Sequence, residues 1–270
     1  MSDPKERIAK IKEAFDKRLP DVESALPEAI KGKADWFIKQ ALLTIAGSVA
    51  SPKTSLSVCT LGSLESMLLM SASTGLVINN KLAYASKRNV NVAPPGQPKV
   101  WESRAQFTPS YIGMVSAAKR CKSIVECWTD VVCEGEFFDA YKTIDGHYLK
   151  HIPSTKTDRA ENIVGAYAVF CMPNGMKLYE YLNALQIEKL KGFSQSVDIW
   201  NTHPIAMFRK CPVRQGLKLL CDDPWLAEIL EADDATYDLS TEKPTNRSAL
   251  NDTLFQGAKD GQPTASSGAA

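Results

Sequence analysis

The stretch IVGAYAVFCMPNGMKLYEY, residues 163–181, contains two apolar runs on either side of a tight-turn signal. Val, Tyr and Phe favour extended backbone, and the runs 163–172 and 176–181 have the length of strands. The PNG between them can reverse the chain, because Asn and Gly tolerate the positive φ angles that a hairpin turn requires. The stretch therefore predicts an antiparallel hairpin. Another strand is expected at 124–138, which is rich in Val.

Helical spacing occurs on both sides of this predicted hairpin. Ile8, Ile11 and Phe15 mark an amphipathic helix within residues 1–33, which could pack on the body or on a neighbouring subunit. Further helices are expected at 35–46, 60–75, 111–122, 183–191 and 203–220. Thr60 is the expected N-cap of the second of these, and a glycine at 75 suits its C-cap.

The segment 76–107 has a different pattern. It contains the short β-like pieces LAYASKR and SRAQF, separated by NVNVAPPGQP, which cannot form a regular helix. We predict a long hairpin with a mobile tip. The fold class is then α+β, with an N-terminal helical lobe, a small antiparallel sheet with a long hairpin packed on helices, and a disordered C-terminal tail.

Charge is distributed unevenly along the 270 residues. The net charge is +1, but residues 231–270 carry seven acidic and three basic side chains, a net charge of −4, which leaves +5 for residues 1–230. The end of the chain also lacks apolar periodicity. We predict an N-terminal helical segment at 1–33, a core at 34–232 and an acidic, flexible tail at 233–270.

Cysteine usage and hydropathy bear on the compartment. The seven cysteines include no CxxC pair, and no apolar stretch follows the charged opening MSDPKERIAKIK. A reduced, cytoplasmic protein is expected. The longest apolar run, 67–72, is far shorter than the roughly 20 residues of a membrane span. Membrane insertion is therefore not expected.

Common catalytic motifs are missing from the sequence. We find neither HExxH nor metal-type Cys and His spacing, and no GxxxxGK[ST], GxGxxG after a strand or GxSxG. No metal, cofactor or catalytic residue is predicted. Glu134 and Glu136 would share one face of a strand, and with His147 they define an alternative, a metal-dependent nuclease or deaminase acting on single-stranded DNA. A solvated strand end is the commoner explanation of such a pair.

Basic residues recur at helical spacing in WNTHPIAMFRKCPVRQGLKLL, residues 200–220. Lys210, Arg214 and Lys218 would form one stripe, with Arg209 beside it, while the apolar residues face the core. Cations about 6 Å apart can follow the phosphates of a nucleic acid. From charge alone, a solvated helix face is the commoner explanation. Pro212 bends the stripe or makes the helix begin near position 211.

Two further basic groups occur beside aromatic residues. One consists of Lys119 and Arg120, with Lys122, and the other of Lys87, Arg88 and Arg104 on the predicted hairpin. With the stripe at 209–218 these make three basic groups, and Tyr84, Tyr111 and Trp200 lie near them in the sequence. Cations with aromatic surfaces for bases are typical of proteins that bind single strands, although burial in the core is the commoner role of each aromatic.

Several short elements, taken in order, resemble the RecT family of phage and prophage single-strand annealing proteins over residues 26–230. The elements are GL at 75–76, LAY at 82–84, AQF at 105–107, YIG at 111–113, AKR at 118–120, VVCEGEF at 131–137, KHIP at 150–153, VGAYAV at 164–169, and WNTH at 200–203 with Met207, Lys210 and Arg214. The chain differs from the family pattern at Ile112, where a basic residue is usual, and at Pro212, where a helix-compatible residue is usual.

The resemblance implies a function. Family members bind single-stranded DNA, form rings and helical filaments, and anneal complementary strands without ATP in homologous recombination. By position, Lys210 and Arg214 would contact phosphates, with Arg209 and Lys218 as supporting charges. The implied partners are single-stranded DNA, the annealed duplex intermediate, further copies of the chain, a companion exonuclease and the single-strand binding protein of a bacterial host cell. The acidic tail would contact such a partner or compete with DNA.

Overall fold

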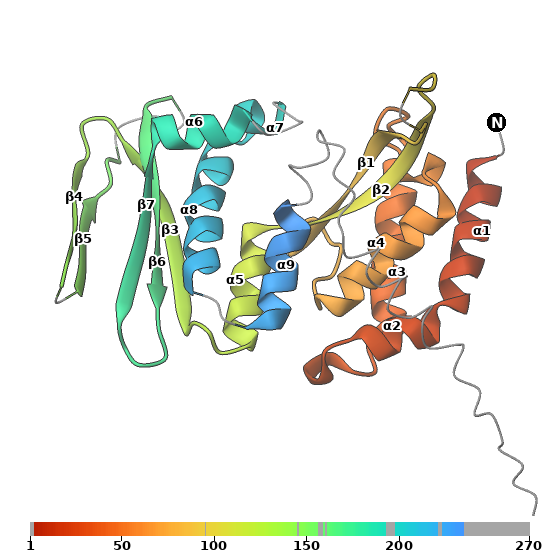
Figure 1. The fold of residues 1–270 in the computed structure, drawn as a ribbon, viewed down its shortest axis with the longest axis horizontal. Helices are drawn as coiled ribbons and strands as arrows, with labels where there is room; N and C mark the ends of the chain where they lie inside the picture. Colours follow the sequence, from red (N-terminus) through yellow and green to blue (C-terminus); the bar gives the residue numbers. More distant parts are fainter. Residues whose placement is uncertain are drawn as a thin grey trace, which may run out of the picture. The chain divides into compact units, whose positions relative to one another are not determined.

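The computed structural model describes residues 3–94, 96–144, 146–155, 159, 161–192, 198–220 and 223–234. Its contacts divide the chain into 1–237 and 238–270, and every described residue belongs to the first unit. The predicted α+β class is confirmed, with helices first and small antiparallel sheets after them (Figure 1). The expected disordered tail beyond 234 lies outside the described residues. Among those residues, no helix combines the length and apolar character needed to cross a membrane.

The N-terminal part consists of short helices around one core. They are α1 (Pro4–Lys17), α2 (Leu19–Ala25), η1 (Glu28–Ile30), α3 (Ala34–Ser48), η2 (Leu56–Val58) and α4 (Leu61–Ser73). The Asp3 carboxylate caps α1 by accepting from the Lys5 N–H at 3.0 Å. Ile11 and Phe15 are fully buried, and α1 contacts α3 and α4. The apolar face of α1 thus packs on the body of its own chain.

The predicted long hairpin forms a ribbon of two nine-residue strands, β1 (Ala83–Asn91) and β2 (Trp101–Pro109). The outer edge of β2 is closed by the start of α4, which limits edge-to-edge pairing. The Thr60 N–H donates to the Ser103 carbonyl, and the Ala105 N–H donates to Ser63 Oγ, both at 2.9 Å. Thr60 is the N-cap residue of α4, as predicted.

The opening stretch of the sequence forms the predicted antiparallel hairpin. β6 (Ile163–Cys171) lies between β3 (Glu126–Cys133) and β7 (Lys177–Asn183) in a sheet of order β3-β6-β7. The Gly175 N–H donates to the Met172 carbonyl at 2.9 Å. In this turn Gly175 takes a positive φ of 83°.

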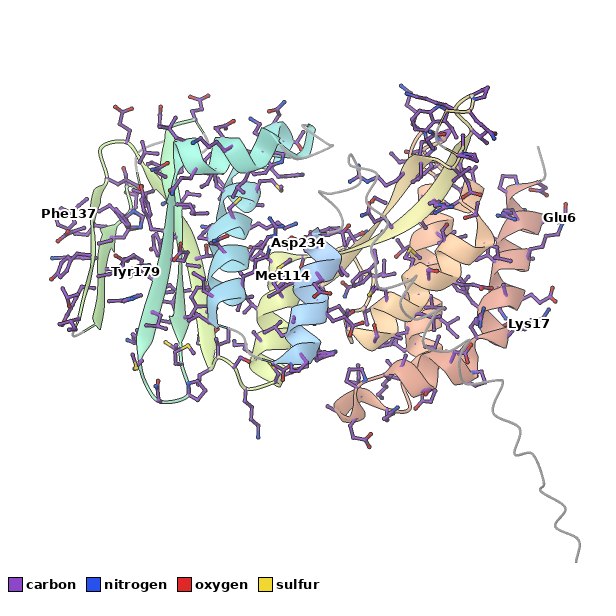
Figure 2. All side chains as sticks on the ribbon, viewed as in Figure 1. Glu6, Lys17, Met114, Phe137, Tyr179 and Asp234 are labelled. Atoms are coloured by element: carbon purple, nitrogen blue, oxygen red, sulfur yellow. The ribbon has the colours of Figure 1, made fainter. Side chains whose placement is uncertain are left out.

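The prediction of one strand over 124–138 is wrong. The chain turns at Gly135, where φ is +79°, and a second hairpin follows, made of β4 (Phe137–Thr143) and β5 (Gly146–Ile152). This hairpin lies against the β3-β6-β7 sheet. Phe138 packs on Tyr167 and Tyr181 of the sheet, whereas Phe137 points away from it (Figure 2). Adjacent residues of a strand face opposite sides, which accounts for this difference.

The remaining helices are α5 (Tyr111–Arg120), α6 (Ala184–Gly192), α7 (Asp198–Thr202), α8 (Pro204–Leu220) and α9 (Pro224–Asp234). α8 continues through Pro212, so a helix start near position 211 is wrong. α9 was not predicted. It is held by Leu226 and Ile229, both fully buried, and by the Trp225 indole N–H, which donates to the Ser73 carbonyl at 2.7 Å.

Candidate nucleic-acid interface

The α8 helix lies against the sheet through its apolar side. Val213 and Leu217 are fully buried, as the helical spacing predicts. Gly216 faces the ring of Phe170 in β6 so closely that a methyl group on Gly216 would lie 2.5 Å from Phe170 Cζ. This close approach fixes which side of α8 is turned away from the sheet. Lys210, Arg214 and Lys218 share a side, as predicted, because all three meet the end of α9.

We call Lys210, Arg214 and Lys218 the α8 row. Its ion-pair partners are two acidic residues at the C-terminal end of α9. Lys210 Nζ lies 2.9 Å from Asp233 Oδ1, and Arg214 Nε lies 2.8 Å from Asp233 Oδ2. Asp234 accepts from Arg214 through Oδ1 and from Lys218 Nζ, at 2.5 Å, through Oδ2. The α8 row is thus an ion-pair cluster with α9. Its cations are paired with carboxylates, so it is not simply a solvated helix face.

Burial divides this cluster into an inner and an outer part. The Asp233 side chain is 0% exposed, and Lys210 and Arg214 are 13% and 17% exposed. Asp234 and Lys218 are 39% and 36% exposed. Burial would raise the pKa of Asp234, but hydrogen bonds and charge from Lys218 and Arg214 outweigh it, so its pKa lies below the usual value. Asp234 therefore carries a negative charge near neutral pH.

Arg209, the neighbour of the row, belongs to a second ion-pair network. Its guanidinium donates to Asp130 Oδ1 at 2.5 Å, and Asp130 also accepts from Arg159. Arg159 Nε donates to Glu136 Oε1 at 3.1 Å, and His151 Nε2 lies 3.0 Å from Glu136 Oε2. The network joins α8, β3 and the β4–β5 hairpin. Arg209 is therefore an anchor of α8 as well as a basic residue near the row.

Burial would raise the pKa of Glu136, yet its hydrogen bonds lower it to about 2. The donors are the backbone N–H groups of Cys133 and Ser154 and the side chains of His151 and Arg159. Glu134, in contrast, is exposed, and His147 accepts through Nδ1 from the Tyr179 N–H at 3.0 Å. The nuclease or deaminase alternative therefore lacks a shared site, because its three residues, Glu134, Glu136 and His147, each have different contacts.

The ribbon brings together two of its three predicted basic residues. Arg88 of β1 and Arg104 of β2 are directly opposite each other in the register, so their side chains lie on one face. Arg88 Nε donates to Gln106 Oε1 at 3.0 Å, and Arg104 Nε donates to Glu102 Oε2 at 2.6 Å. Lys87, one residue before Arg88, points to the opposite face.

The third predicted group is divided among different partners. Lys119 Nζ pairs with Glu126 Oε1 at 2.6 Å. The Arg120 guanidinium donates to the Gly75 carbonyl at 2.9 Å and lies 5.0 Å from the ring centroid of Trp225. Tyr111 packs against the main core. Arg120 and Tyr111 therefore contribute to the packing of α5, whereas the pair of Lys119 and Glu126 lies at the surface, with side chains 37% and 52% exposed.

The aromatic residues near the basic groups also differ in exposure. Trp200 is buried against Phe208 and lies in the core beneath α8, so the structure assigns it a packing role. Tyr84 is exposed, and its place in the register puts it on the same face of the ribbon as Arg88. Ile112, at the departure from the family pattern, is also exposed.

Four residues that shape this region were not predicted as site residues: Asp130, Arg159, Asp233 and Asp234. Asp233 and Asp234 were counted with the acidic tail, because α9 was not recognised. The spacing of Leu226, Ile229 and Leu230 is a helical signal that extends to them. The partners of Asp130 have no such local signal, because Arg159 and Arg209 are distant in the sequence.

The geometry defines an α+β protein with one basic group on a two-stranded ribbon and another on the helix α8, and α9 contacts both β2 and α8 (Figure 1). A model of the RecT family matches residues 35–247, most of the chain. The chain belongs to the RecT family, which confirms the resemblance and implies a protein of the single-strand annealing class in DNA recombination. No curated protein matches the chain significantly.

Proposed function

We propose that this chain binds single-stranded DNA and anneals complementary strands without ATP, acting as a multimer. The observation that carries the proposal is the RecT family match over residues 35–247. The arrangement of basic residues supports it. Arg104 on the ribbon and Lys218 on α8 are the more exposed members of two basic groups, at 48% and 36%.

The DNA-binding surface of the proposal has two parts. Arg88 and Arg104 form the ribbon part, together with the exposed ring of Tyr84, on which a base could stack. Arg209, Lys210, Arg214 and Lys218 form the α8 part. Lys87, Arg120 and Tyr111 have a weaker case, because of their orientation or their contacts within the fold. Lys119, 37% exposed and paired with Glu126, remains a proposed contact on α5.

Annealing requires no bond to be made or broken by the protein. Each subunit would neutralise phosphates of one strand and keep its backbone extended with the bases accessible. A second strand then samples registers against the first, and complementary pairing stabilises the product. Repulsion between the two phosphate backbones is the main barrier that basic side chains can lower.

A multimer suits this mechanism, because one subunit meets only a short piece of a strand. The partners in the proposal are single-stranded DNA, the annealed intermediate and further copies of the chain. A companion exonuclease and a host single-strand binding protein complete the set. Residues 1–33 remain the proposed subunit contact, although Ile11 and Phe15 pack within the chain, so such a contact would use the exposed side of α1.

The experiment measures oligonucleotide binding and annealing for the double variant Arg104→Gln, Lys218→Gln. Each substitution removes one exposed charge and keeps a long polar side chain. We expect about tenfold weaker binding, since exposed charge pairs are worth roughly 0.7 kcal/mol each. The salt dependence of log K should become shallower by about 1.4, because about 0.7 is lost per phosphate contact.

The matched control is Lys142→Gln, Lys177→Gln, which removes the same charge from exposed positions on β4 and β7, outside the proposed surface and outside residues 1–33. It should bind and anneal like the wild type if the effect is local. Equal loss in both double variants would show only a net-charge effect and would contradict the proposed surface. A wild-type chain that binds no oligonucleotide even at low salt would refute the function itself.

A further inference from the structure

The end of α9 places two carboxylates against the cations of the proposed DNA site. Asp234 is the last described residue of α9 and is labelled in Figure 2. Its two oxygens bind different cations, Arg214 through Oδ1 and Lys218 through Oδ2. We infer that Asp234 occupies a phosphate position, and that a DNA phosphate displaces its carboxylate from Arg214 and Lys218. This inference rests on the proposed function.

The chemistry of the two anions supports the exchange. A carboxylate and a phosphodiester each carry one negative charge and present two oxygens that accept charged hydrogen bonds. Arg214 and Lys218 lie one helical turn apart on α8, about 6 Å along the axis. A phosphate between them can accept from both cations, as Asp234 does. The exchange leaves the number of charges in the cluster unchanged.

Exposure shows why Asp234 rather than Asp233 is the exchangeable residue. Asp233 is 0% exposed and lies between Lys210 and Arg214, which are themselves mostly buried. Removing its charge would leave two buried cations without compensation, which is costly. Asp234 is 39% exposed, and its partner Lys218 is 36% exposed. Exposed ion pairs contribute little to stability, so a competing anion can replace one.

The place of Asp234 on its helix makes exchange easier still. The carbonyl groups at the C-terminal end of a helix carry partial negative charge, which disfavours an acidic side chain there. The last turn of α9 holds no basic residue that would offset this effect. The cations of α8 therefore supply the favourable interaction that keeps the Asp234 carboxylate in place. A phosphate that binds those cations therefore displaces a carboxylate that is held less strongly than one at a helix N-terminus would be.

The surroundings fit a path for a strand. α9 contacts both α8 and β2, the elements that carry the two basic groups of the proposed surface. The rest of α9 need not move, because it is anchored by the buried Leu226 and Ile229 and by the hydrogen bond of Trp225 to Ser73. Only the side chain of Asp234 has to leave the cations.

The experiment compares the full-length chain with Asp234→Asn, using an oligothymidine probe over a range of salt concentrations. Asn has the size of Asp but no charge, so it competes less well for Arg214 and Lys218. We expect affinity to rise about three- to tenfold, the value of freeing the two partly exposed ion pairs of Asp234. The salt dependence should steepen by up to about 0.7, one phosphate contact on single-stranded DNA.

Glu228→Gln is the matched control, because it removes one acidic charge from the same helix. Glu228 Oε1 accepts a hydrogen bond from Ser73 Oγ at 3.4 Å, and in the described part of the chain it pairs with neither Arg214 nor Lys218. Its affinity should change less than twofold. A second measurement uses Lys218→Gln, which removes one of the two cations. In that background Asp234→Asn should lose at least half of its gain in affinity, expressed on a logarithmic scale.

The outcomes separate the inference from the function on which it rests. Unchanged or weaker binding by a folded Asp234→Asn chain overturns the inference, and so does an equal gain with or without Lys218. In both cases a wild type that binds and anneals leaves the proposed function standing. If Asp234→Asn does not fold, Asp234 is structural and the inference is overturned as well. A wild type that binds no DNA overturns both.

Discussion

Replacing Gly216 by Ala should destabilise the protein, although the same change in most helices stabilises it. A methyl group at Gly216 would lie 2.5 Å from Phe170 Cζ, and real contacts of this kind are rarely below 3.4 Å. Phe170 is fully buried in β6, so its ring cannot turn aside freely. Relieving the clash requires α8 to shift by about an ångström, and such overpacking costs about 1–3 kcal/mol. Ala gains about 1 kcal/mol over Gly in helix propensity.

The expected net loss is therefore up to about 2 kcal/mol, which lowers the thermal midpoint by several degrees for a domain of this size. Gly47→Ala is the matched control, since Gly47 lies in α3 and a methyl group there meets no atom within 4 Å. It should stabilise the chain by up to about 1 kcal/mol. Urea unfolding of both variants measures the difference. If Gly216→Ala is as stable as Gly47→Ala, then α8 is not seated on Phe170 as described.

Two further predictions concern the buried ion pairs. The pKa of Glu136 is lowered in the fold to about 2, from an ordinary value of 4.5. The charge of Glu136 therefore stabilises the protein above about pH 4.5, by roughly 3 kcal/mol. This contribution is lost as the pH falls from about 4.5 towards 2. Acid unfolding of Glu136→Gln should accordingly show a flatter stability profile over that interval, and an unchanged profile would contradict the assignment. Asp233→Asn should cost about 3–5 kcal/mol and Asp234→Asn less than about 1 kcal/mol, because only Asp233 is fully buried. Equal midpoints in thermal unfolding would be inconsistent with the burial difference.

The parts of the fold that depend on local pattern were predictable. The hairpin around Gly175, the ribbon of β1 and β2, and the helical face of Val213 and Leu217 all follow from periodicity and turn residues. The β4–β5 hairpin was missed, because Gly135 was taken as part of one Val-rich strand. A single glycine in a strand pattern indicates a turn only when the residues after it are recognised as a new strand.

The candidate site was predictable in its residue types and not in its electrostatics. Helical spacing places Lys210, Arg214 and Lys218 on one side, and the structure agrees. Their pairing with Asp233 and Asp234 depends on how α8 and α9 pack, which no local pattern encodes. In the same way, register separates Lys87 from Arg88 and Arg104, and only the strand assignment reveals it. Charge counted along a sequence does not distinguish a paired cation from an available one.

The built-in acids bear on the proposal that this protein works as a multimer. Four cations of α8, at 209, 210, 214 and 218, are paired with three carboxylates, those of Asp130, Asp233 and Asp234. A phosphate approaching α8 therefore meets a net charge near +1 rather than +4, and the attraction per subunit is modest. Several subunits on one strand multiply weak contacts, since each later contact is effectively intramolecular. Weak contacts that add along a strand also let a second strand shift its register before pairing completes, whereas a few strong contacts would hold mismatched strands in place.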